Sequence, residues 1–143
     1  MMLAPSPNAY NMIKKFEGLR LKAYKCSAGK YTIGYGHTYN VKPNDTITVE
    51  EAEKYLIEDV GFVYRELSKL IKVELNQNQV DALTSFVYNV GIGNFGSSTL
   101  LKKINSGKLE EVPPQFLWWV YAGKKILKGL VKRRKEEAEL FIK

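Results

Sequence analysis

A long amphipathic helix in the first half of the chain constrains the fold more than any other feature. Thr48 and Glu51 stand at the two ends of a capping-box sequence, the pattern with which a helix typically begins. Apolar residues then recur three or four positions apart for about six helical turns: Ala52, Leu56, Val60, Val63, Leu67 and Leu70. This spacing predicts a helix over about 49–72, which is long enough to join two lobes.

A shorter helix is predicted near the N-terminus. Ser6 and Pro7 are a typical N-cap and first helical residue, and apolar side chains follow at helical spacing over 8–16. Gly18 then predicts the end of this helix, because glycine accepts the backbone conformation that often follows a last turn. Glu17 is therefore placed at the C-terminal end of a short helix.

The next segment changes to a β pattern. Over 19–35, Tyr, Thr, Ile and Ala alternate with Lys and Gly, and the small residues of 26–30 interrupt them. This pattern predicts a β-hairpin with a small turn. It is the only segment of the chain for which we predict strands.

The second half of the chain predicts further helices. One begins at Asn76 and runs to Val90, another covers 98–106, and a third follows over 115–122, because Pro113 and Pro114 fit only at or before a helix start. A final amphipathic helix is predicted over 131–142. The side chains predicted on its solvent face are Arg133, Arg134, Lys135 and Glu136 to Glu139.

These elements predict an α+β architecture in one domain over 1–143. A small hairpin lobe covers about 17–47. The helix over 49–72 connects it to a larger helical lobe, which covers about 73–143 and includes the N-terminal helix.

The cysteine and histidine content excludes several kinds of site. The chain holds one Cys and one His, so it cannot form an internal disulfide, and a Cys/His zinc site would lack ligands. No apolar run reaches the roughly 18 to 20 residues that a membrane span needs, and the first residues lack the pattern of a secretion signal. We therefore expect no metal, no cofactor and no stable membrane insertion.

Positive charge is concentrated at both ends of the chain. Lys and Arg outnumber Asp and Glu by seven to two in 1–47 and by eight to three in 124–143, whereas 48–74 carries four against seven. A basic surface favours polyanionic partners such as nucleic acid, anionic lipid or the envelope polymers of bacteria. Solubility alone explains such a surplus equally well.

Glu17 is the acid whose position most suggests chemistry. A carboxyl at the C-terminal end of a helix faces the negative end of the helix dipole, which disfavours its ionised form. A general acid benefits from this, because it must hold a proton at the working pH. The alternative is a solvated helix-end residue whose charge is matched by Lys14, Lys15 or Arg20.

Three further residues near Glu17 carry reactive or hydrogen-bonding groups. Cys26 lies at the predicted turn, where neighbouring lysines favour its thiolate, but it has no nearby histidine as a base and is also explained as an incidental small residue. Thr32 is equally explained as a strand former. His37, the only histidine, is equally explained as a packed, hydrogen-bonded side chain.

The spacing of these residues resembles the signature of a known family. Glu17, eight intervening residues, Cys26, five intervening residues and Thr32 match the pattern of the phage lysozyme family, glycoside hydrolase family 24. The segment GKYTIGYGHT over 29–38 continues the resemblance. Further matching segments lie over 47–60, 86–95, 97–101, 115–117 and, in part, 129–137, so the resemblance covers the chain from about Asn8 onward.

The resemblance implies a lysozyme-like fold with a cleft between the lobes, and hydrolysis of the β-1,4 bond between N-acetylmuramic acid and N-acetylglucosamine in bacterial peptidoglycan. Glu17 is then the general acid, and Thr32 orients the attacking water or the reactive sugar. Cys26 takes a position where many members carry Asp. A thiolate is the better nucleophile and a carboxylate stabilises an oxocarbenium-like centre, so inverting and retaining outcomes both stay open.

The resemblance also implies supporting and substrate-binding residues. An aromatic face and polar side chains on the helical wall of the cleft would hold a sugar ring. The residues placed there are Tyr88, Ser98 and Gln115. His37 is expected to support the site, and either Arg133 or Arg134 is expected to pair with Glu17, which would favour the ionised carboxylate and oppose the helix-end effect.

Two other functions fit parts of the sequence. A catalytically silent peptidoglycan-binding module would bind without cleaving, but Glu17 and Thr32 argue against it because loss of activity usually shows at those positions. A basic nucleic-acid binder lacks its aromatic-interleaved patch or recognition helix. We therefore expect a monomeric hydrolase whose partner is peptidoglycan and not nucleic acid, made in the bacterial host cytoplasm and acting on the cell wall or periplasm.

Overall fold

The computed structural model describes residues 2–143 and begins with the predicted N-terminal helix. Helix α1 covers Pro7–Glu17 and ends at Gly18, whose φ of +72° favours glycine. Ser6 is the N-cap, but its side chain does not bond to the helix. Its backbone N–H donates to the buried Asp81 carboxylate at 2.8 Å, and its hydroxyl donates to the same carboxylate. The start of α1 is thus tied to a residue far along the chain.

The predicted hairpin follows α1. Strand β1 (Arg20–Lys25) pairs antiparallel with β2 (Tyr31–Gly34), and Tyr24 lies opposite Thr32. The turn closes where the Cys26 N–H donates to the Lys30 carbonyl at 2.8 Å. The hairpin therefore carries Cys26 at its turn and Thr32 on its second strand.

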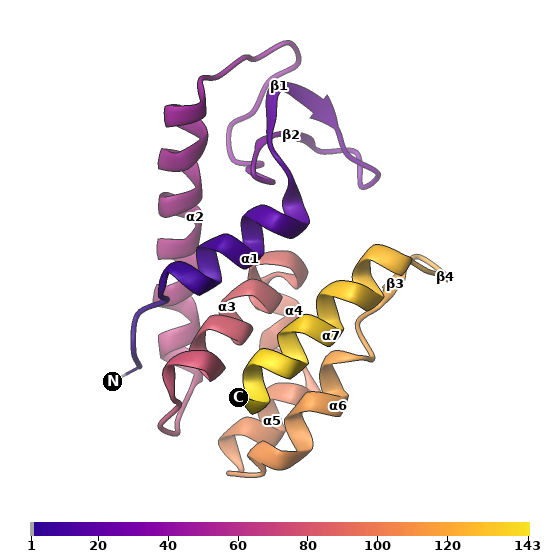
Figure 1. Ribbon diagram of the computed structural model, residues 1–143. Coiled ribbons are helices and arrows are strands. Elements are labelled where there is room, and N and C mark those ends of the chain that lie inside the picture. The colour runs from indigo at the N-terminus through magenta and orange to yellow at the C-terminus, as the bar shows by residue number, and fades with distance from the viewer. Residues whose placement is uncertain (1) are drawn as a thin grey trace.

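Helix α2 covers Val49–Leu70 and begins with the predicted capping box. The Thr48 hydroxyl accepts from the Glu51 N–H at 3.1 Å, and the Glu51 carboxylate accepts from the Thr48 N–H at 3.0 Å. Its fully buried side chains follow the predicted stripe as far as Leu67. In Figure 1, α2 runs along one side of the molecule from the hairpin to the helical lobe, so it joins the two.

Helix α3 (Gln77–Val90) forms the centre of the helical lobe. It begins with a second capping box, between Asn76 and Gln79, and every residue from Val80 to Val87 is buried. Short helices follow it: α4 (Ile92–Gly96), α5 (Thr99–Asn105), the 3₁₀ helix η1 (Leu109–Glu111) and α6 (Val112–Phe116). The Phe86 ring packs edge-to-face against Phe95, Phe116 and Trp119, so α3 organises the core.

Two predictions about the segment after α5 are wrong. The helix predicted over 115–122 instead starts at Val112 and ends at Phe116, because Pro113 and Pro114 lie in its first turn, where a helix needs no N–H donor. Strands β3 (Tyr121–Ala122) and β4 (Lys125–Ile126) form a second antiparallel hairpin, although only one β region was predicted. Strands of this length are too short to give a periodic signal.

Helix α7 (Lys128–Ile142) packs against α3 and α6, as the yellow helix in Figure 1 shows. The prediction that its charged residues face solvent is wrong for Arg133, Arg134 and Glu137, which are 3%, 1% and 0% exposed. These side chains pair with one another, which is the condition under which charged groups are buried.

The arrangement is the predicted α+β fold, with the hairpin at one end of α2, the helical lobe at the other, and α1 between them. Within residues 2–143, no helix combines the length and the apolar character needed to cross a membrane.

Candidate active site

Glu17, the last residue of α1, lies where the helical lobe meets the hairpin. Its Oε2 accepts a hydrogen bond from Arg133 Nη1 at 2.7 Å, while 20% of its side chain stays exposed. A Cβ added at Gly36 would come within 2.5 Å of Glu17 Oε1, so the backbone that follows β2 lies directly against the carboxylate. Glu17 is therefore held from two sides and still reaches solvent.

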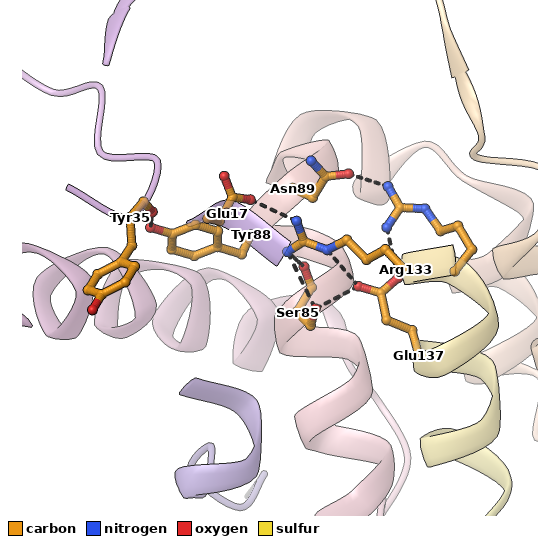
Figure 2. Close-up of polar contacts among 8 residues, drawn as sticks. Glu17, Tyr35, Ser85, Tyr88, Asn89, Arg133 and Glu137 are labelled. Atoms are coloured by element: carbon orange, nitrogen blue, oxygen red, sulfur yellow. Dashed lines mark hydrogen bonds and ion pairs between the residues drawn. The ribbon is translucent and has the colours of Figure 1, made fainter. Parts of the chain in front are cut away.

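Arg133 connects Glu17 to a buried polar cluster, drawn in Figure 2. Its Nε donates to Glu137 Oε2 at 3.2 Å, and its Nη2 donates to the Ser85 carbonyl at 2.9 Å. The Ser85 hydroxyl donates to the same Glu137 oxygen at 2.7 Å. The sequence left open which arginine pairs with Glu17, and the structure shows that it is Arg133.

Arg134 belongs to the same cluster but turns away from Glu17. Its Nη1 donates to Glu137 Oε1 at 2.8 Å, its Nε donates to the Trp119 carbonyl at 2.8 Å, and its Nη2 donates to the Asn89 side chain. Burial lowers the pKa of the Arg134 guanidinium, and the Glu137 carboxylate opposes that effect. Arg134 thus holds the Glu137 and Asn89 side chains in place through hydrogen bonds.

Cys26 and Thr32 meet at the turn of the first hairpin. Cys26 is a half-buried free thiol, and Thr32 is buried with its hydroxyl donating to the Lys30 carbonyl at 3.3 Å. Hydrogen bonds from the Lys30 and Ala28 backbone, followed by one from the Thr32 side chain, lower the pKa of the Cys26 thiol. The direction agrees with the prediction, but the cause is hydrogen bonding and not the charge of the nearby lysines.

His37 links the segment after β2 to helix α2. Its Nδ1 lies 2.7 Å from Asp59 Oδ2, and its ring stacks on Tyr55 with the centroids 4.3 Å apart. Burial raises the pKa of the Asp59 carboxyl, and the hydrogen bond from His37 opposes this. Residues 2–143 contain no group of three or more His, Cys, Asp or Glu side chains placed to hold a metal ion. His37 is therefore a buried side chain with one polar and one aromatic contact on α2.

A groove of about 610 Å³ opens next to the segment that contacts Glu17, although Glu17, Cys26 and Thr32 are not among the residues that line it. It is lined by residues 36–39, by the part of α2 around Asp59 and Phe62, and by Tyr88 and Ile92 where α3 meets α4. Gly36 belongs both to this lining and to the contact with Glu17. Its volume is in the range of ligand-binding clefts.

Tyr88 joins the groove to the acid. Its hydroxyl donates to the Tyr35 carbonyl at 2.5 Å, and Figure 2 shows its ring beside Glu17. Burial is the main cause that raises the pKa of the Tyr88 phenol, and the nearby Asp59 and Glu17 charges act in the same direction. Tyr88 therefore lines the groove as an uncharged aromatic side chain near the carboxylate.

Comparison with known proteins agrees with this geometry. A family model described as phage lysozyme matches residues 14–137, which include the acid, the hairpin and the buried cluster. The chain belongs to the phage lysozyme family.

Individual relatives support the same assignment. An endolysin of Acyrthosiphon pisum secondary endosymbiont phage 1 is 50% identical over 91% of this chain and 92% of its own length. The muramidase domain of SpmX from Asticaccaulis excentricus superposes with a TM-score of 0.89 at 35% identity, covering 96% of this chain and 97% of that one. A mutant of phage P22 lysozyme gives a TM-score of 0.84 at 40% identity, covering 99% and 100%. The protein is a peptidoglycan hydrolase of the lysozyme type, a muramidase glycoside hydrolase.

The three residues expected on the helical wall of the lysozyme cleft occupy different positions. Tyr88 lines the groove. Gln115 is half-buried and lines a separate hollow of about 470 Å³ with Trp118 and Trp119. Ser98 is 5% exposed, and its hydroxyl donates to the Phe95 carbonyl and accepts from the N–H of Leu101. Ser98 therefore caps α5 and does not line the groove.

Sequence reasoning missed several residues of the site. Glu137 was placed on the solvent face of its helix, and Ser85, Asn89 and Asp59 were not singled out. The one available signal was spacing, since residues three and four apart on a helix share a face, and Glu137 follows Arg134 by three positions and Arg133 by four. That spacing does not tell whether the shared face is buried.

Proposed function

We propose that Glu17 is the general acid of this muramidase and protonates the leaving oxygen of the β-1,4 bond between N-acetylmuramic acid and N-acetylglucosamine. A general acid must reach the substrate and be held in one orientation. The observation that carries the proposal is the position of Glu17, which bonds to Arg133 at 2.7 Å, lies against Gly36 at the edge of the groove and keeps 20% of its side chain exposed.

Cys26 acts on the opposite side of the reacting sugar in this proposal, and Thr32 orients the group that attacks. In a retaining route the thiolate bonds to the anomeric carbon as the glycosidic bond breaks, and Glu17 gives its proton to the leaving oxygen. A water oxygen then bonds to the same carbon as the carbon–sulfur bond breaks, and the Glu17 carboxylate takes the proton of that water. In an inverting route a water oxygen bonds to that carbon and passes its proton to the sulfur, while the glycosidic bond breaks and Glu17 protonates the leaving oxygen. The lowered pKa of Cys26 supports a charged sulfur in both routes. The anomer released first, followed by NMR, separates the routes.

The remaining parts of the proposal concern binding and context. Tyr88 in the groove and Gln115 in the separate hollow contact the glycan, Ser98 holds the start of α5 as its cap, and His37 supports the backbone beside Glu17. The chain acts as one monomeric lysozyme domain over 1–143. It is made in the bacterial host cytoplasm and binds peptidoglycan in the cell wall or periplasm, and it does not bind nucleic acid.

Replacement of the acid tests the proposal. Glu17→Gln keeps the shape of the side chain and removes the transferable proton, so lysis of permeabilised Gram-negative cells should fall by about 10²–10⁴-fold. Glu136→Gln is the matched control, because it removes a carboxylate that pairs with Lys15 outside the groove, and it should keep full lysis. Mass spectrometry of digested peptidoglycan identifies the bond cut. Lysis by Glu17→Gln above a tenth of the parent level would contradict the assignment.

A silent binding module is the alternative, and the same experiment distinguishes it. Such a module would bind purified cell walls and sediment with them, but it would release no muropeptides. Release of muropeptides by the parent chain, lost in Glu17→Gln while wall binding is kept, selects the enzyme.

A further inference from the structure

Glu137 takes no part in the proposed reaction, yet it lies one guanidinium group away from Glu17. Its Oε2 accepts from Arg133 Nε at 3.2 Å and from the Ser85 hydroxyl at 2.7 Å, and its Oε1 accepts from Arg134 Nη1 at 2.8 Å. It is 0% exposed. A carboxylate with three donors and no solvent contact is fixed in place, and it fixes the groups that bind it.

The orientation of Arg133 depends on this carboxylate. Arg133 uses Nη1 for Glu17, Nη2 for the Ser85 carbonyl and Nε for Glu137. A guanidinium held through three of its nitrogens presents a defined donor to Glu17, as Figure 2 shows. Without Glu137, both Nε of Arg133 and the Ser85 hydroxyl would lose their acceptor.

The charges of the cluster also depend on Glu137. Glu17, Arg133, Arg134 and Glu137 sum to zero when Glu17 is ionised and to one positive charge when it is protonated. If Glu137 were neutral, the positive charges of Arg133, which bonds to Glu17, and of Arg134 behind it would have no second anion to offset them. The protonated form of Glu17, which a general acid requires, would then be disfavoured.

We propose that Glu137 is a positioning residue for the acid. It orients Arg133 toward Glu17, and its negative charge offsets the positive charges of the two arginines behind the acid. This inference rests on the proposed role of Glu17 as the general acid.

Other groups around Glu17 do not provide this charge. On α1, Lys14 and Lys15 pair with Glu53 and Glu136, on α2 Asp59 pairs with His37, on β1 Arg20 lies over the Tyr24 ring, and on α3 Tyr88 is an uncharged phenol. Within residues 2–143, Glu137 is the only acid other than Glu17 that forms a salt bridge with Arg133 or Arg134.

The test compares charge-changing and charge-keeping variants. In Glu137→Gln the alkaline limb of the pH profile of kcat/KM, where the acid loses its proton, should move to lower pH by about one pH unit. In Arg134→Gln, which removes a positive charge, it should move to higher pH. Glu137→Asp keeps the negative charge on a shorter side chain that no longer contacts Arg133 in the same way. The alkaline limb should therefore keep its position on the pH scale while kcat falls. A merely structural role would lower activity in all three variants without moving the limb.

A readout independent of activity completes the test. The midpoint for protonation of Glu17, followed by NMR of its labelled side-chain carboxyl, should move in the same directions as the alkaline limb. If Glu137→Gln does not fold, the double variant Arg134→Gln/Glu137→Gln takes its place, because it removes both charges of one ion pair. Glu17 should be half-protonated at a lower pH in the double variant than in Arg134→Gln alone. Equal midpoints for Glu17 protonation in the parent and the variants would overturn the proposal. If Glu17→Gln retained lysis, the role of Glu17 would be lost, while the NMR midpoints would still report the coupling to Glu137.

Discussion

At the scale of a single residue, Gly36 leaves the room that the Glu17 carboxylate occupies. Its φ of +79° is strained for other residues, and a Cβ there would lie 2.5 Å from Glu17 Oε1. We expect Gly36→Ala to displace the carboxylate, to lower lysis by more than about tenfold and to lower the free energy of unfolding by about 1–3 kcal/mol. Turbidity assays and thermal melts measure the two effects.

Gly29 offers a matched control for that substitution. It has a φ of +84°, but a Cβ there would meet nothing within 4 Å. Gly29→Ala should therefore share the backbone strain and keep lysis. Equal losses of lysis in the two variants would show that the contact of Gly36 with Glu17 has no role.

Cys26 can be tested through the ionisation of its thiol. Because hydrogen bonds lower the pKa of Cys26, the thiolate fraction at neutral pH is higher in the folded chain than in the unfolded chain. Alkylation by iodoacetamide should accelerate as pH rises, level off at a lower pH in the folded protein than in urea, and stop lysis. Mass spectrometry follows the modification.

Substitutions of Cys26 separate a functional thiol from an incidental one. Cys26→Ser should lose most lysis, because a hydroxyl does not ionise near neutrality. Cys26→Asp should keep or recover it, because a carboxylate is ionised over the working range. Full lysis by Cys26→Ser would show that the thiol is an incidental turn residue.

At the scale of an element, Ser98 belongs to helix α5 as its cap. Its hydroxyl accepts from the Leu101 N–H at 3.0 Å, so Ser98→Ala should lower the free energy of unfolding by about 1 kcal/mol. Thr48→Ala removes an equivalent cap from α2 and should have a similar effect. Both variants should bind chitin oligomers as the parent does. Weaker binding by Ser98→Ala alone, with an unchanged melting temperature, would point to direct contact with the sugar.

Helix α2 acts at the scale of the whole molecule, because the hairpin and the helical lobe both attach to it (Figure 1). The groove is lined by residues 36–39, which follow the hairpin, and by α2 and the junction of α3 with α4, so we expect its width to change when a glycan enters. Spin labels at the exposed positions Lys30 and Lys124, each changed to Cys in a Cys26→Ala background, report the distance between the two hairpins. A muropeptide oligomer should narrow and shift the distance distribution, and identical distributions with and without it would leave no support for a hinge.

Interactions between close neighbours in the sequence determined the main secondary-structure elements of this protein and the spacing of its expected catalytic residues. The capping box of Thr48 with Glu51, the apolar stripe of α2, the stop at Gly18 and the first hairpin all depend on contacts within a few residues. The spacing of Glu17, Cys26 and Thr32 carried the family and the expected chemistry, because these residues follow one another along one short segment.

Only the tertiary structure decided which charges are buried and what they bind. Glu17 meets Arg133 across 116 positions of the chain, and Ser85 meets Glu137 across 52. A helical pattern shows which residues share a face, but it does not show whether that face is buried, because the groups that cover it and complete its hydrogen bonds, such as Ser85 and Glu17, lie on other helices. For that reason the periodicity of the last helix placed Arg133 and Glu137 in solvent. The packing of α7 against α3 instead placed both in the cluster behind the acid.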